Sequence, residues 1–383
     1  MSATVNQIVA GSNGDPIGAD AYKWRLASAI SAYKAGLRTR PPIIMGIGDS
    51  NFTGEGGGTG GTALLNGGFA ASPMQNIGRY ATSIGGLPIR NTAFFGEGNS
   101  GNNSIPVGLY DTRITLGSGW DRDAATGPIG GRFIDGQIGS GFLTVNFGSP
   151  LDTVEVHYPT NTTLSAALGV YASDDTLIGT INQSGALGIS SQQFTSSKFA
   201  DGIVKFRNDG AALALITGAI CWLSTEKAVI ICQGTWSAAT AATYAATTNP
   251  WTGMGHMSRI QPDCTIIALT INDINAGTVT ATYGTNLAAV VAVPALWGDV
   301  VVATGAPCNA TNWTANSTWR TLEREAIKAG AFYGAPFVSM HNEFGSWASA
   351  NAQGYCYNNL HMSASGYRKQ AEVFASVLSR MAF

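Results

Sequence analysis

The sequence predicts an α/β protein whose parallel sheet is covered by helices on both faces and is interrupted by an antiparallel β module. Short, nearly continuous apolar runs recur in the first and last parts of the chain, with segments of helical spacing between them. The middle of the chain instead alternates apolar and polar residues over short stretches broken by Gly, Asn, Asp and Ser. Continuous apolar runs are typical of parallel strands buried on both faces, and alternation is typical of antiparallel sheets.

The first elements expected are a helix, a strand and a second helix. Residues 20–36 carry apolar and aromatic residues near helical spacing and end at a glycine, which predicts an amphipathic helix. Residues 43–47 read IIMGI and predict a buried strand. A glycine-rich loop at 54–61 and a helix near 70–84 follow, and a second apolar stretch, LPIRNTAFF, covers 87–95.

The β module is expected between these elements and the rest of the α/β domain. Its alternating stretches read FLTVNF, DTVEVHY, LGVYAS, TLIGTI and GIVKFRN. We expect a β-sandwich-like module at 100–223, inserted into an α/β domain made of residues 1–99 and 224–383 with a helical N-terminal extension. After the insertion, strands are expected at 228–234, 264–271, 299–307 and 335–340, and helices at 317–330 and 364–382.

Charge and cysteine content exclude several classes of function. Charged residues make up 11% of the 383, the net charge is −2, and Lys and Arg form no run, so no nucleic-acid partner is expected. The five cysteines are scattered and contain no C-x-x-C pair, so we expect no metal site. The amino terminus lacks a basic start followed by an apolar stretch, and no apolar segment of about 18 residues occurs later. We therefore expect neither a Sec signal nor a membrane span, and a cytoplasmic or virion-associated protein.

Ser50 is the candidate nucleophile. It follows the predicted strand 43–47 at its carboxyl end, where ligands of open α/β sheets bind. A serine hydroxyl needs a neighbouring base, usually histidine, and donors aimed at the oxyanion. His361 stands on a loop directly before a helix whose start Ser363 signals, which is a suitable place for a base above a serine at a strand end.

The other three histidines are less suited to this role. His157 lies in the β module and His256 in a Met- and Gly-rich stretch, so both are expected to be structural. His341 follows the last predicted strand and is expected to line the pocket if it has a functional part.

Three stretches carry a family resemblance: GIGDSNFTGEG around Ser50, TIIALTINDIN around Asn272, and NNLHMSASGYRKQA around His361. In this order they resemble the SGNH, or GDSL-type, hydrolases, which are serine esterases and lipases on a flavodoxin-like three-layer sandwich. The motifs span residues 43–383 and leave the β module uncovered. The resemblance implies Ser50 as nucleophile and His361 as general base, with no metal or organic cofactor.

The resemblance also implies supporting groups around the nucleophile. Asn272 matches the family's oxyanion asparagine, with Asp273 as its partner, and Asp49 precedes the nucleophile. The backbone N–H of Ser50 is a further expected oxyanion donor.

The family's second-block glycine, whose N–H completes the oxyanion hole, has two candidates. Gly96 follows the apolar stretch 87–95, and Gly234, or the nearby amide of Ser237, follows the strand expected at 228–234. Gly96 is slightly preferred, and the sequence leaves both open.

Asn358 departs from the family pattern. An aspartate normally stands three residues before the histidine, where it holds the imidazole tautomer and stabilises its cation. An amide oxygen can accept the Nδ1 proton but brings no charge, and the NH₂ group can hold the other tautomer. In another serine hydrolase this exchange lowers kcat by about 10⁴. The resemblance therefore implies weakened activity, rescue by another carboxylate such as Glu343, or a Ser–His dyad with a carbonyl orienter.

The favoured function is a serine esterase that removes O-acetyl groups from a polysaccharide through an acyl-serine intermediate. The chain shows no large apolar lid, and its β module has polar, Gly/Ser/Thr-rich strands, which resembles carbohydrate-active members of the family more than lipases. The expected partner is an acylated glycan or another small ester, and the module is a candidate carbohydrate-binding unit. The alternative is a phage or virion structural or receptor-binding protein with a degenerate SGNH domain that binds glycans without efficient turnover.

Overall fold

The computed structural model describes residues 24–57, 71–96, 111–126, 129, 131–246, 250–309 and 316–383. The start of the helix expected at 20–36, part of the loop expected at 54–61 and the first residues expected in the β module lie outside these ranges.

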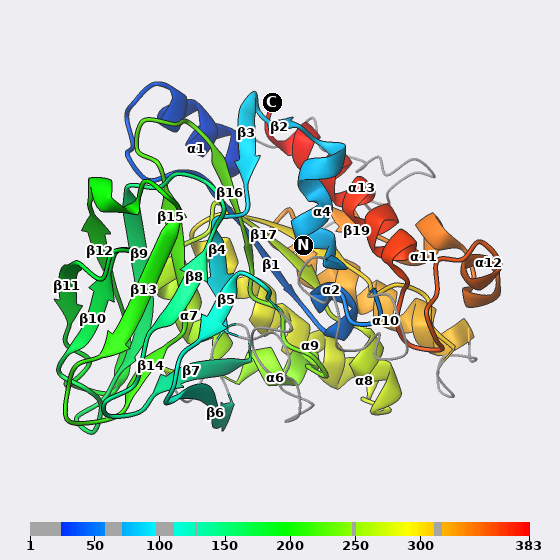
Figure 1. The fold of residues 1–383 in the computed structure, drawn as a ribbon. Helices are drawn as coiled ribbons and strands as arrows, with labels where there is room; N and C mark the ends of the chain where they lie inside the picture. The colour runs from blue at the N-terminus through cyan, green and yellow to red at the C-terminus, as the bar shows by residue number, and fades with distance from the viewer. Residues whose placement is uncertain are drawn as a thin grey trace.

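A seven-stranded sheet forms the centre of the α/β domain, in the order β19-β18-β17-β1-β16-β3-β2 (Figure 1). Neighbouring strands from β3 to β19 run parallel, and β2 pairs with β3 in antiparallel orientation. The bounds are β1 (Ile43–Gly48), β2 (Ser83–Ile84), β3 (Leu87–Arg90), β16 (Val229–Gln233), β17 (Cys264–Ala268), β18 (Asp299–Ala303) and β19 (Phe337–Val338). The parallel sheet expected from the apolar runs is confirmed.

Helices cover both faces of this sheet, and the alternation along β1 shows why. Ile43, Met45 and Ile47 join one buried cluster, whereas Ile44 joins the cluster on the opposite face. The Ile44 face is covered by α1 (Arg25–Lys34), α2 (Ser50–Thr53), α4 (Pro73–Tyr80), α11 (Met340–Phe344), α12 (Trp347–Ala352) and α13 (Ala364–Met381). The other face is covered by α6 (Ala241–Ala245), α7 (Gly253–Ile260), α8 (Ile271–Asn275), α9 (Thr280–Ala292), the 3-10 turn η3 (Pro294–Leu296) and α10 (Asn316–Ala331). The three-layer arrangement follows from strands that are apolar on both faces.

The chain between β3 and β16 forms the inserted β module, which lies beside the α/β domain in Figure 1. Its three antiparallel sheets have the orders β11-β10-β13-β8-β5, β12-β9-β15-β4 and β14-β7-β6. The strands are β4 (Ala93–Phe95), β5 (Ile114–Leu116), β6 (Trp120–Thr126), β7 (Arg132–Gly136), β8 (Leu143–Asn146), β9 (Thr153–Thr160), β10 (Leu168–Tyr171), β11 (Leu177–Ile181), β12 (Gly188–Thr195), β13 (Ile203–Asn208), β14 (Ala214–Ile216) and β15 (Gly218–Trp222), with a 3-10 turn η2 (Ser197–Phe199).

A core shared by the two larger sheets makes the module a sandwich. Val154 and Val156 of β9 pack in one cluster with Val204 and Phe206 of β13. Alternate residues of β13 are buried, as expected for a strand with one face on a core.

The module is packed firmly on the α/β domain. Phe95, Ile220 and Trp222 belong to the same buried cluster as β1. At the junction, the Arg40 guanidinium pairs with both carboxylate oxygens of Glu155, at 2.9 and 3.1 Å, and also donates to a backbone oxygen of the α/β domain. Charge pairing and apolar packing therefore both join the two parts.

None of the helices in the described part of the chain is both long enough and apolar enough to cross a membrane.

Candidate active site

Ser50 stands where β1 turns into helix α2. The chain leaves β1 at Gly48, and Asp49 caps the helix by accepting a hydrogen bond from the N–H of Asn51 at 3.0 Å. Helix α2 folds back closely on the strand, because a Cβ at Gly48 would lie 2.4 Å from the Cβ of Phe52. The glycine therefore permits the sharp turn that places Ser50 at the carboxyl end of the sheet.

His361 is brought to Ser50 by the loop before α13. Its Nε2 lies 3.1 Å from the Ser50 Oγ. Asn51 ties the loop to α2, because its Nδ2 donates to the Leu360 carbonyl at 2.9 Å and its Oδ1 accepts from the Met362 N–H at 3.2 Å. The serine and histidine singled out from the sequence are thus held together at a distance suited to proton transfer.

Burial controls the charge of this histidine. The side chain of His361 is 13% exposed, and burial lowers its pKa to about 4. The imidazole is therefore neutral near pH 7, which is the state that a general base requires.

Asn358 lies beside His361 but presents its NH₂ group to the ring. Its Oδ1 accepts hydrogen bonds from the backbone N–H groups of Leu360, at 2.8 Å, and His361, at 2.7 Å. The amide nitrogen is consequently directed to His361 Nδ1, at 3.3 Å. The side-chain oxygen is engaged by the backbone, so it is not the group that meets Nδ1.

Glu55 is a site residue that the sequence reasoning missed. Its Oε2 lies 3.5 Å from His361 Nε2, and its backbone N–H donates to the Ser50 carbonyl at 3.1 Å. Burial raises the pKa of Glu55, and a hydrogen bond from Ser237 opposes that rise. The available signal was an acidic residue within the glycine-rich stretch directly after the nucleophile.

The Asn272 amide reaches the same edge of the sheet. It stands in α8, directly after β17, and its Nδ2 donates to the Ala239 carbonyl at 3.0 Å. An NH₂ group has two protons, so one remains for an oxyanion. Asp273 orients the neighbouring loop by accepting from the Ala241 N–H at 2.9 Å, and burial raises its pKa to about 6.

The two glycines considered for the remaining oxyanion donor have other partners. The N–H of Gly96 donates to the Thr217 carbonyl at 2.6 Å, and the N–H of Gly234 donates to the Gly46 carbonyl at 2.8 Å. Both expectations are therefore corrected, because a backbone N–H engaged in strand pairing cannot also stabilise an oxyanion.

The loop after β16 still reaches the site through other residues. The N–H of Trp236 donates to the Gly48 carbonyl at 2.9 Å, directly before the Asp49–Ser50 turn. Ala238 follows with a φ of 62°, which is unusual for a residue with a side chain. This conformation turns the backbone between the segment held at Gly48 and Ala239, whose carbonyl accepts from Asn272.

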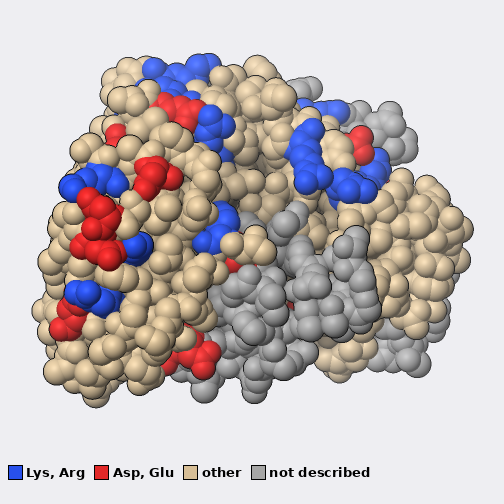
Figure 2. Space-filling model, viewed as in Figure 1, with Lys and Arg blue, Asp and Glu red and all other residues tan. Residues whose placement is uncertain are grey.

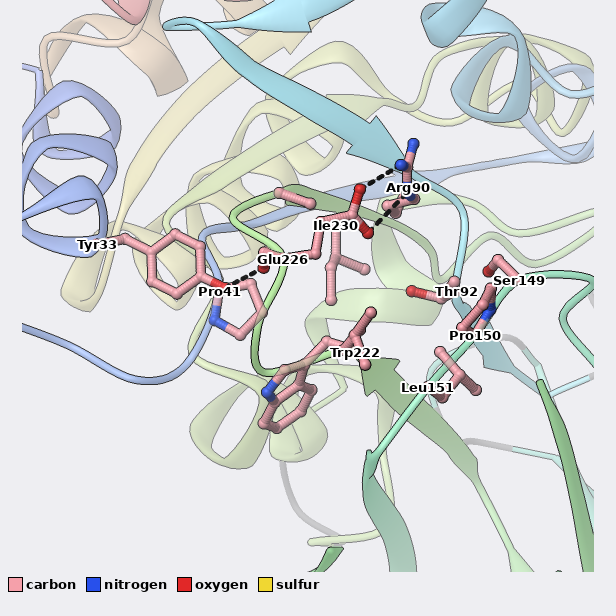
Figure 3. A pocket seen from close by; sticks show the side chains of 12 residues that line it. Tyr33, Pro41, Arg90, Thr92, Ser149, Pro150, Leu151, Trp222, Glu226 and Ile230 are labelled. Carbon is pink, nitrogen blue, oxygen red and sulfur yellow. Dashed lines mark hydrogen bonds and ion pairs between the residues drawn. The ribbon is translucent and has the colours of Figure 1, made fainter. Parts of the chain in front are cut away.

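The cavities found in the described part of the chain have linings that include neither Ser50 nor His361. Figure 3 shows one of about 10 Å³, near the amino ends of β1 and β16, where Glu226 pairs with Arg90 and accepts from the Tyr33 hydroxyl through its carbonyl. It is at the opposite end of the sheet from the Ser50–His361 pair, and its volume is at the lower limit of what one water molecule needs. A larger cavity of about 450 Å³ is lined by His341, whose ring stacks on Trp319 at 4.1 Å. His341 thus lines a cavity whose lining does not include Ser50.

Within the described ranges, His, Cys, Asp and Glu side chains form no group of three or more suited to hold a metal ion. Figure 2 shows acidic and basic side chains interleaved over the module face.

Residues 229–369 match the GDSL-like Lipase/Acylhydrolase family. Among solved structures, the chain is similar to a peptidoglycan O-acetylesterase, with a TM-score of 0.67 and 15% identity over 95% of this chain and 97% of that one. It is also similar to a family two carbohydrate esterase from Clostridium thermocellum solved with cellohexaose, with a TM-score of 0.31 and 11% identity over 69% and 97% of the two chains. The comparison with curated proteins finds no match. The first similarity shows that the fold is shared over nearly the whole chain, module included.

Proposed function

We propose that this chain, whose residues 229–369 match the GDSL-like Lipase/Acylhydrolase family, is a serine esterase that removes O-acetyl groups from a polysaccharide. The observation that carries the proposal is the 3.1 Å contact between Ser50 Oγ and His361 Nε2 at the carboxyl end of a parallel sheet.

In the proposed reaction, Ser50 Oγ attacks the ester carbonyl while its proton passes to the base at His361. The backbone amide of Ser50 and the free proton of the Asn272 amide stabilise the oxyanion. The Ala238 amide is our candidate for the third donor, in place of Gly96 and Gly234, since its loop is held against Gly48. The sugar alcohol leaves, and water then hydrolyses the acyl-serine by the same steps in reverse order.

Two observations support a glycan as the substrate. The fold is shared with a peptidoglycan O-acetylesterase across both the α/β domain and the module. The module also presents a surface on which acidic and basic groups are interleaved, which suits a polar polymer better than a lipid (Figure 2).

One observation favours the second candidate, a glycan-binding phage or virion component with little turnover. The Asn358 NH₂ group, and no carboxylate, faces His361 Nδ1. A site that kept this geometry without an alternative proton acceptor would bind an ester and hydrolyse it slowly.

Acetate release separates the two candidates. We expect the wild-type protein to release acetate from p-nitrophenyl acetate and from O-acetylated peptidoglycan, and Ser50→Ala to lose about 10³-fold or more of that rate. Circular dichroism serves as the folding control. Equal inertness of both proteins on every acetylated glycan tested, with the fold intact, would contradict the esterase and leave the binding role.

A further inference from the structure

The cavity of about 450 Å³ beside His341 lies at the same edge of the sheet as Ser50. His341 follows β19 at its carboxyl end, and Arg320 stands near the start of α10, the helix that follows β18. Both strands run in the same direction as β1, so their carboxyl ends share one edge. β19 is the third strand from β1 in the sheet order, which places the two strands about 14 Å apart. A short oligosaccharide can span that distance.

The loop after β18 contacts both the cavity and the catalytic site. Its Thr304 Oγ1 accepts a hydrogen bond from the N–H of Met340, directly before His341, at 2.9 Å. Farther along the loop, the N–H of Asn309 donates to the Asn359 carbonyl at 2.6 Å, in the segment that carries the general base. The cavity and the base are therefore tied to the same short stretch of chain.

Two arginines line the cavity with positive charge. Arg320 and Arg324 are both exposed and stand four residues apart on one face of α10, where Arg324 Nε donates to the Arg320 carbonyl at 3.4 Å. In the described part of the chain, no ion pair engages either guanidinium, whereas Glu325 of the same helix pairs with Lys328. Like charges at this spacing disfavour a helix, so the stability of α10 does not account for the two arginines.

The other titratable groups of the cavity leave this lining positive. Burial and the charge of Arg320 lower the pKa of His341, so its ring is neutral near pH 7. Burial raises the pKa of Glu323, and a hydrogen bond from Ser339 and the charge of Arg320 oppose that rise. Even with Glu323 ionised, two guanidinium groups against one carboxylate leave one net positive charge. The lining therefore matches an anion with a single charge.

An aromatic surface adjoins the arginines. The His341 ring stacks on the Trp319 indole, with ring centroids 4.1 Å apart and planes inclined by 34°. Trp319 is only 6% exposed, so the imidazole forms most of the accessible ring surface. Asn342 adds an exposed amide that can both donate and accept hydrogen bonds. A ring surface with a few convergent polar groups is typical of a small-molecule site, and the volume of this cavity falls in the usual range.

We propose that this cavity is a second binding site for the polysaccharide, in which Arg320 and Arg324 hold a carboxylate of the polymer while Ser50 acts on a neighbouring acetyl group. A planar guanidinium presents two N–H donors that match the two oxygens of a carboxylate. A doubly charged phosphate fits less well, because Glu323 lies in the same lining. The inference rests on the proposed function and deepens it, since it makes the substrate an acidic polysaccharide.

Binding to Ser50→Ala tests the inference without turnover. Isothermal titration calorimetry compares an oligogalacturonate with the same oligosaccharide after reduction of its carboxyl groups to alcohols. We expect the acidic form to bind about tenfold more tightly at low salt and the preference to fall as salt rises. Adding Arg320→Gln and Arg324→Gln is expected to abolish the preference. Arg79→Gln, which changes an exposed arginine in the last turn of α4, is the matched control and is expected to keep it.

A second pair of probes distinguishes the two sources of a carboxylate. A soluble peptidoglycan fragment carries its carboxylates outside the sugar rings, and it is compared with its own carboxyl-reduced form. A preference for the acidic form that depends on the two arginines assigns a ring carboxylate in the first pair and a substituent carboxylate in the second. Equal binding of acidic and reduced forms in both pairs, a preference that survives the loss of both arginines, or no binding of any probe overturns the inference.

Turnover separates this inference from the proposed function. The ratio of kcat/KM for the O-acetylated form of the bound fragment to kcat/KM for p-nitrophenyl acetate is expected to fall about tenfold in Arg320→Gln/Arg324→Gln, chiefly through KM, because the arginines do not touch the reacting atoms. An active esterase in which this ratio is unchanged overturns the inference alone. A wild-type protein that is inert on every ester, while Ser50→Ala shows the arginine-dependent preference, contradicts the proposed function alone.

Discussion

Ser50 is surrounded by buried carboxyl groups. Burial raises the pKa of Asp49 to about 7 and that of Asp273 to about 6, and the charges of Asp273 and Glu55 add to the rise at Asp49. A desolvated carboxylate destabilises the folded state whenever it is ionised, so the nucleophile stands in a region that is less stable than its packing alone would make it.

Replacing Asp49 by asparagine tests whether the ionised, buried carboxylate destabilises the folded state. The pKa of Asp49 is raised from 3.8 to about 7, so the folded protein binds the extra proton and the wild type loses stability as pH rises between these values. Asparagine does not ionise, so the variant lacks this dependence of stability on pH. Its side-chain oxygen can still accept a hydrogen bond from the Asn51 N–H. We expect the melting-temperature difference between Asp49→Asn and wild type to be small below about pH 4, to grow up to about pH 7 and then to level off.

Differential scanning calorimetry across that pH range makes the measurement. Glu372→Gln, an exposed carboxylate on α13, is the control and is expected to show no comparable trend. A difference for Asp49→Asn that does not vary with pH would show that the Asp49 carboxyl is not desolvated.

At the residue scale, the sequence predicted the groups whose chemistry depends on a motif. Ser50 and His361 lie in contact, and Asn272 reaches the neighbouring loop. Glu55 escaped prediction because only the fold shows that its carboxylate lies beside His361 Nε2. Gly96 failed for a similar reason, since only the fold shows that its N–H is used in strand pairing.

At the scale of elements, the close approach of α2 to β1 is what positions the nucleophile. Phe52, on α2, lies against Gly48 so closely that a methyl group has no room there. It also packs edge-on against Phe374 of α13, with ring centroids 5.4 Å apart. The helix that carries Ser50 is thus held between the sheet and the C-terminal helix.

Gly48→Ala is expected to push α2 away from the strand. Overpacking of this kind costs about 1–3 kcal/mol of unfolding free energy. Because Ser50 moves with α2, we also expect a fall in esterase rate. Urea unfolding and acetate release measure the two effects.

Gly185→Ala is the matched control, since a Cβ at Gly185 meets nothing within 4 Å. If Gly48→Ala were as stable and active as this control, the turn would tolerate a side chain and the close approach would not set the position of Ser50.

Long buried strands were predicted well, and short or divided ones were not. β1, β17 and β18 appear within the apolar stretches expected as strands at 43–47, 264–271 and 299–307. The stretch 87–95 was read as one run, but β3 joins the parallel sheet and β4 joins the sandwich. Local sequence cannot reveal this division, because the partner of β4 is β15, whose Ile220 pairs with Ala93.

At the scale of the whole molecule, Arg40 joins the α/β domain to the module through Glu155. Burial alone would raise the pKa of Glu155, but hydrogen bonds and charge from His157 and Arg40 outweigh it and lower the pKa. The side chain of His157 is fully buried, and its Nε2 also lies 3.1 Å from the Glu155 carboxylate. The ionised Glu155 side chain is therefore stable at the junction only while the Arg40 guanidinium is present.

Arg40→Met is expected to lower the unfolding free energy by about 2–4 kcal/mol, because it leaves Glu155 charged and largely buried. The double variant Arg40→Met/Glu155→Gln removes that charge and is expected to recover part of the loss. Lys198→Met, which breaks an exposed ion pair with Asp174, should change stability little. Urea titration compares the three, and similar effects of Arg40→Met and Lys198→Met would contradict a stabilising role at the junction.

The division of the chain into an α/β fold and an inserted β module was predictable because the periodicity of apolar residues changes between them. The contact between the two parts was not, since it depends on single pairs such as Arg40 and Glu155 that are far apart in the chain.

The position of β1 in the sheet has a consequence for the order in which the protein folds. Ile43 pairs with Ile230 on one side, and Ile44 pairs with Cys264 on the other, so both neighbours of this strand are made only after the whole module has been synthesised. Contacts of such long range are slow to form. During translation the module has all its strands before β1 has any partner, and His361 is synthesised later still, so we expect the Ser50–His361 contact to form late in folding.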